Sequence, residues 1–136
     1  MPIVRIDLAD SRPPAQQRAI SDGVHRAFTR SVGIPEGDRF HIISPHPAYE
    51  LIADPDYLGV SRQDVVYIQI TLVAGRSVDV KRSLYQAVVE ELTAVGVRPE
   101  DVAIVLTENT RADFSFGNGE AQVVALGPLA GTTPTV

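Results

Sequence analysis

The chain opens with an alternating pattern of apolar and polar residues and then changes to a helical one. Residues 3–8 place Val4, Ile6 and Leu8 on one face, which predicts a half-buried strand. A helix-start signal follows, with Ser11 as the expected N-cap ahead of two prolines. Gly33 and Pro35 end this helix, and residues 40–44 predict a second short strand. The helix's apolar stripe consists of Ile20, Val24, Ala27, Phe28 and Val32.

The second half of the chain repeats this order. Residues 65–73 form the strongest predicted strand, and residues 102–107 predict the last one. Between them Ser77 can cap a helix whose apolar stripe is Val80, Leu84, Val88, Leu92 and Val95. The two helix exits align at a period of about 63 residues, which indicates an internal duplication. The aligned pairs are Gly33 with Gly96, Pro35 with Pro99, and Asp38 with Asp101.

Two β-α-β units, at about 2–44 and 65–107, predict an α+β fold. Each unit needs a right-handed crossover between parallel strands. Side by side they give a four-stranded sheet with both helices on one face, a ferredoxin-like arrangement. Because the strand at 65–73 is apolar on both faces, we expect a second copy of the chain to cover the open face in a homo-oligomer.

The remaining segments are irregular. Residues 45–64 form a long, turn-rich connection of a length associated with function or partner contacts. Residues 1–126 are expected to form one domain, and residues 127–136 have no periodicity and predict a loose C-terminal tail.

Composition narrows the possible chemistry. The 136 residues are 44% hydrophobic with a formal charge of −5, which argues against a broad nucleic-acid surface but leaves room for a local anion pocket. No apolar run reaches the roughly 18–20 residues of a membrane span, and the N-terminus does not read as an export signal, so a cytoplasmic protein with no membrane partner is expected. Cysteine is absent and the three histidines are scattered, which makes thiol chemistry and zinc sites poor candidates.

Two polar side chains and one amine are candidates for chemistry. After removal of Met1, Pro2 would carry a secondary amine able to act as a base or acid, although a Met-Pro start is common and often has no function. Arg76 stands before a predicted helix at the end of a strand, where a small carboxylate could bind; a solvent-facing arginine is the alternative. Asp38 could orient water or a substrate hydroxyl, but its counterpart Asp101 equally favours a structural role in a turn.

The aromatic and histidine residues give weaker signals. Phe114 and Phe116 precede a glycine-rich turn, which by itself predicts a hairpin with exposed aromatic side chains. His25, His41 and His46 cannot be paired with a serine or carboxylate from the sequence, so a hydrolase triad has no support.

Four segments together resemble the tautomerase superfamily, and within it the malonate semialdehyde decarboxylase group. They are MPIVRIDL, GIPEGDRF, QITLVAGRSVDVK and FSFGNGEAQ, in the family's order and spacing, and the resemblance extends to about residue 126. It implies the tautomerase fold, assembled as a trimer with active sites near subunit interfaces. It also implies reactions that need no cofactor.

The resemblance assigns roles to particular residues. The catalytic amino-terminal proline falls on Pro2, the aspartate that activates water or assists decarboxylation on Asp38, and the carboxylate-binding arginine on Arg76. Phe114 and Phe116 fall on the substrate pocket, Phe114 where the family has tryptophan. Two further departures are Ala74-Gly75-Arg76 in place of an Arg-Pro-Arg run, and Val123 in place of a later aromatic residue.

Three functions follow as expectations. The first is decarboxylation of malonate semialdehyde to acetaldehyde and CO2, which suits a cationic Pro2. The second is keto–enol tautomerisation of a 2-oxo acid such as phenylpyruvate, which suits a neutral Pro2. The third, of another class, is a non-catalytic ferredoxin-like module that binds a metabolite or partner, in which Pro2 could stay blocked by Met1.

Overall fold

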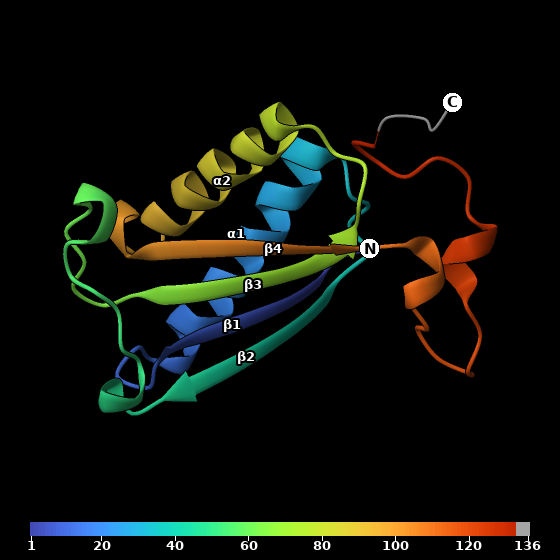
Figure 1. Cartoon of the computed structure of the whole chain (residues 1–136). Helices are drawn as coiled ribbons and strands as arrows, with labels where there is room; N and C mark the ends of the chain where they lie inside the picture. The colour runs from blue at the N-terminus through green and yellow to red at the C-terminus, as the bar shows by residue number, and fades with distance from the viewer. Residues whose placement is uncertain (133–136) are drawn as a thin grey trace.

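A computed structural model describes residues 1–132, and it shows two β-α-β units joined in one sheet (Figure 1). The strand order is β2-β1-β3-β4, with β1 parallel to β2, β3 parallel to β4, and β1 antiparallel to β3. Helices α1 and α2 cover one face of the sheet, which confirms the predicted architecture. The strands are β1 Ile3–Ala9, β2 Phe40–His46, β3 Val66–Val73 and β4 Val102–Asn109, so β2 and β4 run two residues further than predicted.

Helix α1 (Pro14–Val32) begins later than the capping signal predicted. Its N-cap is Pro13, which makes no side-chain cap hydrogen bond, so the assignment of Ser11 as N-cap is wrong. The reason is steric: a residue before proline is held in the extended region, and Pro13 accordingly has ψ 153°. Pro14 can open the helix because the first helical position needs no N–H partner. Gly33 ends the helix at φ 81°, as expected.

Helix α2 (Val78–Thr93) has the predicted N-cap, but it ends before Val95, the last residue of its predicted apolar stripe. The Ser77 hydroxyl accepts a hydrogen bond from the Val80 N–H. The helix stops before Val95 because the Val97 N–H turns back to the Leu92 carbonyl at 3.0 Å, a closure that places Gly96 at φ 95°. Val95 still packs against the core from outside the helix.

The core lies between the helices and one face of the sheet. On β3 the residues that face the helices are at most 3% exposed: Val66, Ile68, Ile70 and Leu72. On the opposite face of the same strand, Gln69 is exposed, and Tyr67 and Thr71 are half-buried. Burial of β3 on both faces is therefore not achieved within one chain.

The antiparallel join of β1 and β3 decides which segments meet. Ile3, at the start of β1, pairs with both Phe40 and Thr71, so the beginnings of β1 and β2 lie beside the end of β3. The chain after β4 gathers at this same end of the sheet (Figure 1). It carries the short 3-10 helices η4 (Arg111–Asp113) and η5 (Gln122–Ala125). We call this the N-terminal end of the sheet.

The segment that follows β4 packs as a second small core rather than as an exposed hairpin. Val73, Phe114 and Val123 are buried together, with Met1, Phe116 and Leu129 packed against them. Phe114 is only 5% exposed, so the expectation of exposed aromatic side chains on a hairpin is wrong for this residue. Residues 127–132 also depart from the loose tail that was predicted, because Leu129 and Ala130 contact the rest of the chain. Residues 133–136 of that tail lie outside the described residues.

The long connection 45–64 lies at the opposite end of the sheet (Figure 1). It holds the 3-10 helices η1 (Ala48–Glu50) and η2 (Tyr57–Gly59). A third 3-10 helix, η3 (Pro99–Asp101), anchors it, because the Asp101 carboxylate accepts the Gln63 N–H at 2.8 Å. In the described part of the chain no helix is both long and apolar enough to cross a membrane.

His41, on β2, is held neutral by its contacts with α1. Arg39 donates to the Ser21 hydroxyl oxygen at 2.8 Å, which leaves the hydroxyl hydrogen for Nδ1 of His41, also at 2.8 Å. Burial is the main cause that lowers the pKa of His41 from 6.5 to about 4, and the positive charge of Arg39 adds to it. A protonated ring would lose its acceptor at Nδ1 and place a charge against the core.

His41 should therefore make the protein less stable as the pH falls from 6.5 to 4. In this window the unfolded chain binds a proton at His41 and the folded chain does not, so stability is lost on acidification. His46 does not contribute here: Asp7 and Glu50 raise its pKa, so its stabilising effect is lost only as the pH rises above 6.5. Thermal melts between pH 7 and pH 4 should show a shallower fall in Tm for His41→Gln than for wild type. Parallel Tm curves would contradict this role of His41.

Candidate functional site

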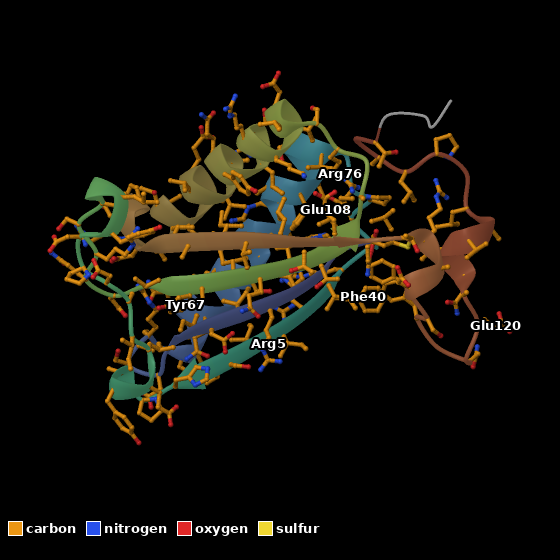
Figure 2. The ribbon with its side chains drawn as sticks, viewed as in Figure 1. Arg5, Phe40, Tyr67, Arg76, Glu108 and Glu120 are labelled. Carbon is orange, nitrogen blue, oxygen red and sulfur yellow. The ribbon has the colours of Figure 1, made fainter. Side chains whose placement is uncertain are left out.

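A cavity of about 710 Å³ opens at the N-terminal end of the sheet. It lies between the chain's first residue, the turn that follows α1, and the segment after β4. Figure 2 shows Phe40 and Arg76 at this end, near the last segment of the chain. The lining residues are largely apolar, and the side chains that bring charge or polarity are Asp38, Arg76 and Gln122.

The N-terminal amine reaches the carboxylate of Asp38 inside this cavity. The Met1 ammonium lies 2.9 Å from Asp38 Oδ2, and both side chains are about five-sixths buried, with 16% and 15% exposed. The turn before β2 positions Asp38, whose N–H donates to the Pro35 carbonyl at 3.0 Å. A carboxylate placed here gives a terminal ammonium an ion-pair partner. The site therefore couples the chain terminus to an acidic group.

Asp38 and its duplicate Asp101 have taken different roles. Asp101 is 1% exposed, and its carboxylate oxygens accept hydrogen bonds from the Gln63 N–H and the Arg98 guanidinium. The antiparallel join places it at the opposite end of the sheet, where the neighbouring cavity is only about 120 Å³. The turn role that the sequence favoured thus holds for Asp101, whereas Asp38 faces the larger cavity.

Arg76 follows β3 and lines the cavity with a guanidinium that is 8% exposed. It donates to the Val73 carbonyl at 2.9 Å and to the Ala130 carbonyl at 2.8 Å, which uses two of its five N–H donors. Its buried Nε–H has no partner among residues 1–132. Burial lowers the pKa of Arg76, and Glu108 opposes this effect. The guanidinium stays charged at neutral pH and retains donors for a carboxylate.

The counterpart of Arg76 in the first unit is already neutralised. Arg12 is also 8% exposed and also keeps an unpartnered buried Nε among the described residues. It lies at the other end of the sheet, and its Nη2 is 3.2 Å from the Asp64 carboxylate. Each of the two arginines stands three residues after the end of a strand, but only Arg76 faces the cavity of about 710 Å³.

The aromatic residues form one wall of the cavity. Phe116 and Phe40 both line it, with ring centroids 4.6 Å apart. Phe114 stacks on Phe116 at 5.4 Å but does not itself line the cavity. It supports the wall from behind, in contrast to the substrate contact that the resemblance implied for it.

Pro2 is buried and precedes the start of β1. Met1 lines the cavity while Pro2 does not, and the Pro2 nitrogen is an amide while Met1 is attached. The geometry therefore brings Asp38, Arg76 and Phe116 together around the chain terminus, one residue from Pro2. A free Pro2 amine requires the loss of Met1.

Sequence reasoning missed several lining residues. Phe40 was assigned only to a strand, and the cavity residues 126–130 fell at the end of the domain and in the predicted tail. Gln122 was not predicted as a site residue because a single glutamine is not part of a recognisable sequence motif. The register Ile3–Phe40 could have revealed Phe40, since both residues begin parallel strands at the same end of the sheet.

A cation, a carboxylate and a terminal amine around one cavity can hold a small acid. The guanidinium can bind a substrate carboxylate, and the amine can exchange a proton with a neighbouring carbon or oxygen atom. Among residues 1–132 no group of three or more histidine, aspartate or glutamate side chains could hold a metal ion.

Comparisons with known proteins agree with this geometry. A family model described as tautomerase enzyme matches residues 38–117, and a second of the same description matches residues 2–61. The probable tautomerase YusQ of Bacillus subtilis is 36% identical over 126 residues, which cover 91% of this chain and 99% of YusQ.

Solved structures extend the likeness. A malonate semialdehyde decarboxylase, FG41, inhibited by 3-bromopropiolate, is 41% identical with a TM-score of 0.86 over 90% of this chain and 94% of its own. A second malonate semialdehyde decarboxylase, described with decarboxylase and hydratase activities, is 31% identical with a TM-score of 0.84 over 90% and 95%. A fused 4-OT symmetric trimer, 23% identical with a TM-score of 0.76 over 91% and 99%, shares the fold.

The matches run over nearly the whole chain, and the two decarboxylase structures share both its fold and much of its sequence. The chain is an enzyme of the tautomerase superfamily and belongs to its malonate semialdehyde decarboxylase-like group.

Proposed function

We propose that this protein decarboxylates a small 3-oxo acid of the malonate semialdehyde type, with Pro2 as the catalytic amine after removal of Met1. The observation that carries the proposal is the Met1 ammonium 2.9 Å from Asp38 in the cavity that Arg76 also lines. A Pro2 amine begins one residue further along the chain, and its ammonium form would find an ion-pair partner in Asp38. A cationic Pro2 suits decarboxylation better than proton abstraction.

The proposed mechanism assigns one task to each group. Arg76 binds the substrate carboxylate, and the Pro2 ammonium donates a hydrogen bond to the carbonyl oxygen. The bond between the carboxylate carbon and C2 breaks, CO2 leaves, and the electron pair forms an enolate whose oxygen the ammonium stabilises. A water molecule then gives a proton to C2, which yields the aldehyde. Asp38 pairs with the ammonium throughout.

Keto–enol tautomerisation of a 2-oxo acid such as phenylpyruvate is the second candidate. The pair Phe40–Phe116 supports it, because a wall of two rings 4.6 Å apart can pack against an aryl group. This reaction needs a neutral Pro2 that takes a proton from C3. The two functions therefore differ in the charge that Asp38 and Arg76 together impose on the amine.

We also propose that the enzyme acts as a homotrimer with a small carboxylate as its ligand. The sheet face turned away from the helices leaves apolar side chains exposed, among them Ile3, Ile42 and Val105. A second copy of the chain would remove these side chains from water. The fold shared with a trimeric fused 4-OT supports three copies rather than two.

Protein that begins at Pro2 should convert malonate semialdehyde to acetaldehyde. A proton NMR time course, on protein whose start is verified by intact mass, should show acetaldehyde appearing well above the buffer blank. Protein that retains Met1 should be inactive, because its Pro2 nitrogen is an amide without a basic electron pair. Equal rates above the blank with and without Met1 would rule out Pro2 as the catalytic group.

Substitutions at the site should separate catalysis from binding. Pro2→Ala, which replaces a constrained secondary amine with a primary one, should lower kcat by roughly 100-fold or more. Arg76→Ala should mainly raise KM, with a loss of about 1.5–3 kcal/mol for a charge-assisted hydrogen-bond set.

Arg12→Ala is the matched control for Arg76→Ala. Both arginines are 8% exposed and both donate to backbone carbonyls, so the two variants should lose similar stability in thermal melts. Only the Arg76 variant should lose affinity for substrate. A comparable rise in KM for both variants would assign the effect to weakened folding rather than to carboxylate binding.

A further inference from the structure

We propose that the natural substrate carries an apolar group on the carbon between its carboxylate and its carbonyl, so that it is a 2-substituted 3-oxo acid. This inference rests on the proposed function and names its substrate class more closely. Three properties of the site support this inference. They are the size of the cavity, the position of the Met1 side chain, and the small number of polar side chains in the cavity lining that are free to bind a substituent.

The cavity is larger than malonate semialdehyde needs. Pockets of roughly 300–1,000 Å³ hold drug-sized ligands, and this one measures about 710 Å³. A three-carbon acid bound at Arg76 would leave most of that space to water. The apolar lining, which includes Ile34, Phe40, Phe116 and Leu129, would then stay wet and contribute nothing to binding.

The Met1 side chain marks where an apolar group binds. Its ammonium pairs with Asp38, while its side chain packs on the small core of Val73, Phe114 and Val123. Loss of Met1 removes an unbranched apolar side chain from its position against this small core and leaves a recess beside Pro2. Val73 and Val123 are short aliphatic side chains, so the recess against this small core is apolar.

The site offers few partners to a polar substituent. Gln122 is the third polar side chain in the lining, but its Oε1 accepts the Phe116 N–H at 3.0 Å and its Nε2 donates to the Gly117 carbonyl at 2.8 Å. Asp38 and Arg76 are required by the carboxylate and carbonyl chemistry. A hydroxyl or amide on the substituent would therefore lose its water without gaining a partner, at a cost in affinity.

The reaction balances as it does for the unsubstituted acid. The bond from C2 to the carboxylate carbon breaks, CO2 leaves, and water supplies the one proton that is added at C2. The product is an aldehyde that keeps the apolar group on the carbon next to its carbonyl. No oxidant, reductant or second substrate is needed.

Binding of simple carboxylates tests the recess separately from turnover. Isothermal titration of the Pro2-started protein should give hexanoate an affinity at least roughly tenfold higher than propanoate, because its additional methylene groups leave water. Protein that retains Met1 should show a smaller preference, since Met1 occupies the recess while the rest of the apolar cavity stays open. Phe116→Ala should reduce the preference several-fold. Tyr49→Ala, at an exposed aromatic residue at the opposite end of the sheet, should keep it. Equal affinities for the two acids would overturn the proposal.

Turnover measurements then distinguish the proposed substrate class from the proposed decarboxylase function. The proposal predicts a kcat/KM for 2-butyl-3-oxopropanoate at least roughly tenfold above that for malonate semialdehyde, measured by proton NMR of the aldehyde products. Faster turnover of malonate semialdehyde would overturn the substrate class while upholding decarboxylation. A clear preference for hexanoate with no decarboxylation of either oxo acid would overturn the proposed function and this substrate class with it.

Discussion

The antiparallel pairing of β1 with β3 is the constraint on which the site depends. Ile3 pairs with Thr71, so the first residues of the chain lie beside the end of β3 and the arginine that follows it. The parallel pairing of β1 with β2 brings the turn carrying Asp38 to the same place. Each β-α-β unit alone supplies only part of the site. Their head-to-tail arrangement brings an amine, a carboxylate and a guanidinium around one cavity.

The same duplication explains why the cavity of about 710 Å³ lies at the N-terminal end of the sheet rather than at the opposite end. The opposite end of the sheet carries Arg12 and Asp101 in positions equivalent to Arg76 and Asp38. There, Asp64 pairs with Arg12, and Asp101 holds the connection 45–64 through Gln63. The charges of Arg12 and Asp101, which could have met a ligand, are paired within the protein. The segment after β4 encloses the N-terminal end instead, and its own small core fixes the wall of the cavity.

Much of the fold followed from local patterns, because the elements are strongly periodic. The alternation in residues 65–73, the cap at Ser77 and the glycine after each helix all act within a few residues, and the structure has them nearly as expected. Ser11 failed as a cap because a neighbouring proline pair overrides a capping side chain. Helix α2 ends before Val95, although Val95 continues its apolar stripe. The hydrogen bond from the Val97 N–H to the Leu92 carbonyl closes the helix, and the spacing of apolar residues does not predict that bond.

Local features made Pro2, Asp38 and Arg76 separate candidates, and only a resemblance placed them in one site. Pro2, Asp38 and Arg76 are distant in sequence, and the pairing of strands that unites them carries no local signal. Phe114 shows the limit of transferring a motif: it supports Phe116 from behind and does not line the cavity. Residues 126–130 have no periodicity, and they contribute to the cavity through contacts such as that between the Ala130 carbonyl and Arg76.

The central claim is that Pro2 supplies a reactive amine beside a carboxylate-binding arginine. Its most direct test is the site of covalent labelling by 3-bromopropiolate, an electrophilic acetylenic acid that inhibits the related FG41 decarboxylase. The sequence has no cysteine, and Lys81 is its one lysine, so few other nucleophiles compete. Peptide mass spectrometry of the Pro2-started protein should find the label on Pro2, with slower labelling in Arg76→Ala. Label on Lys81, or no label at all, would contradict the account.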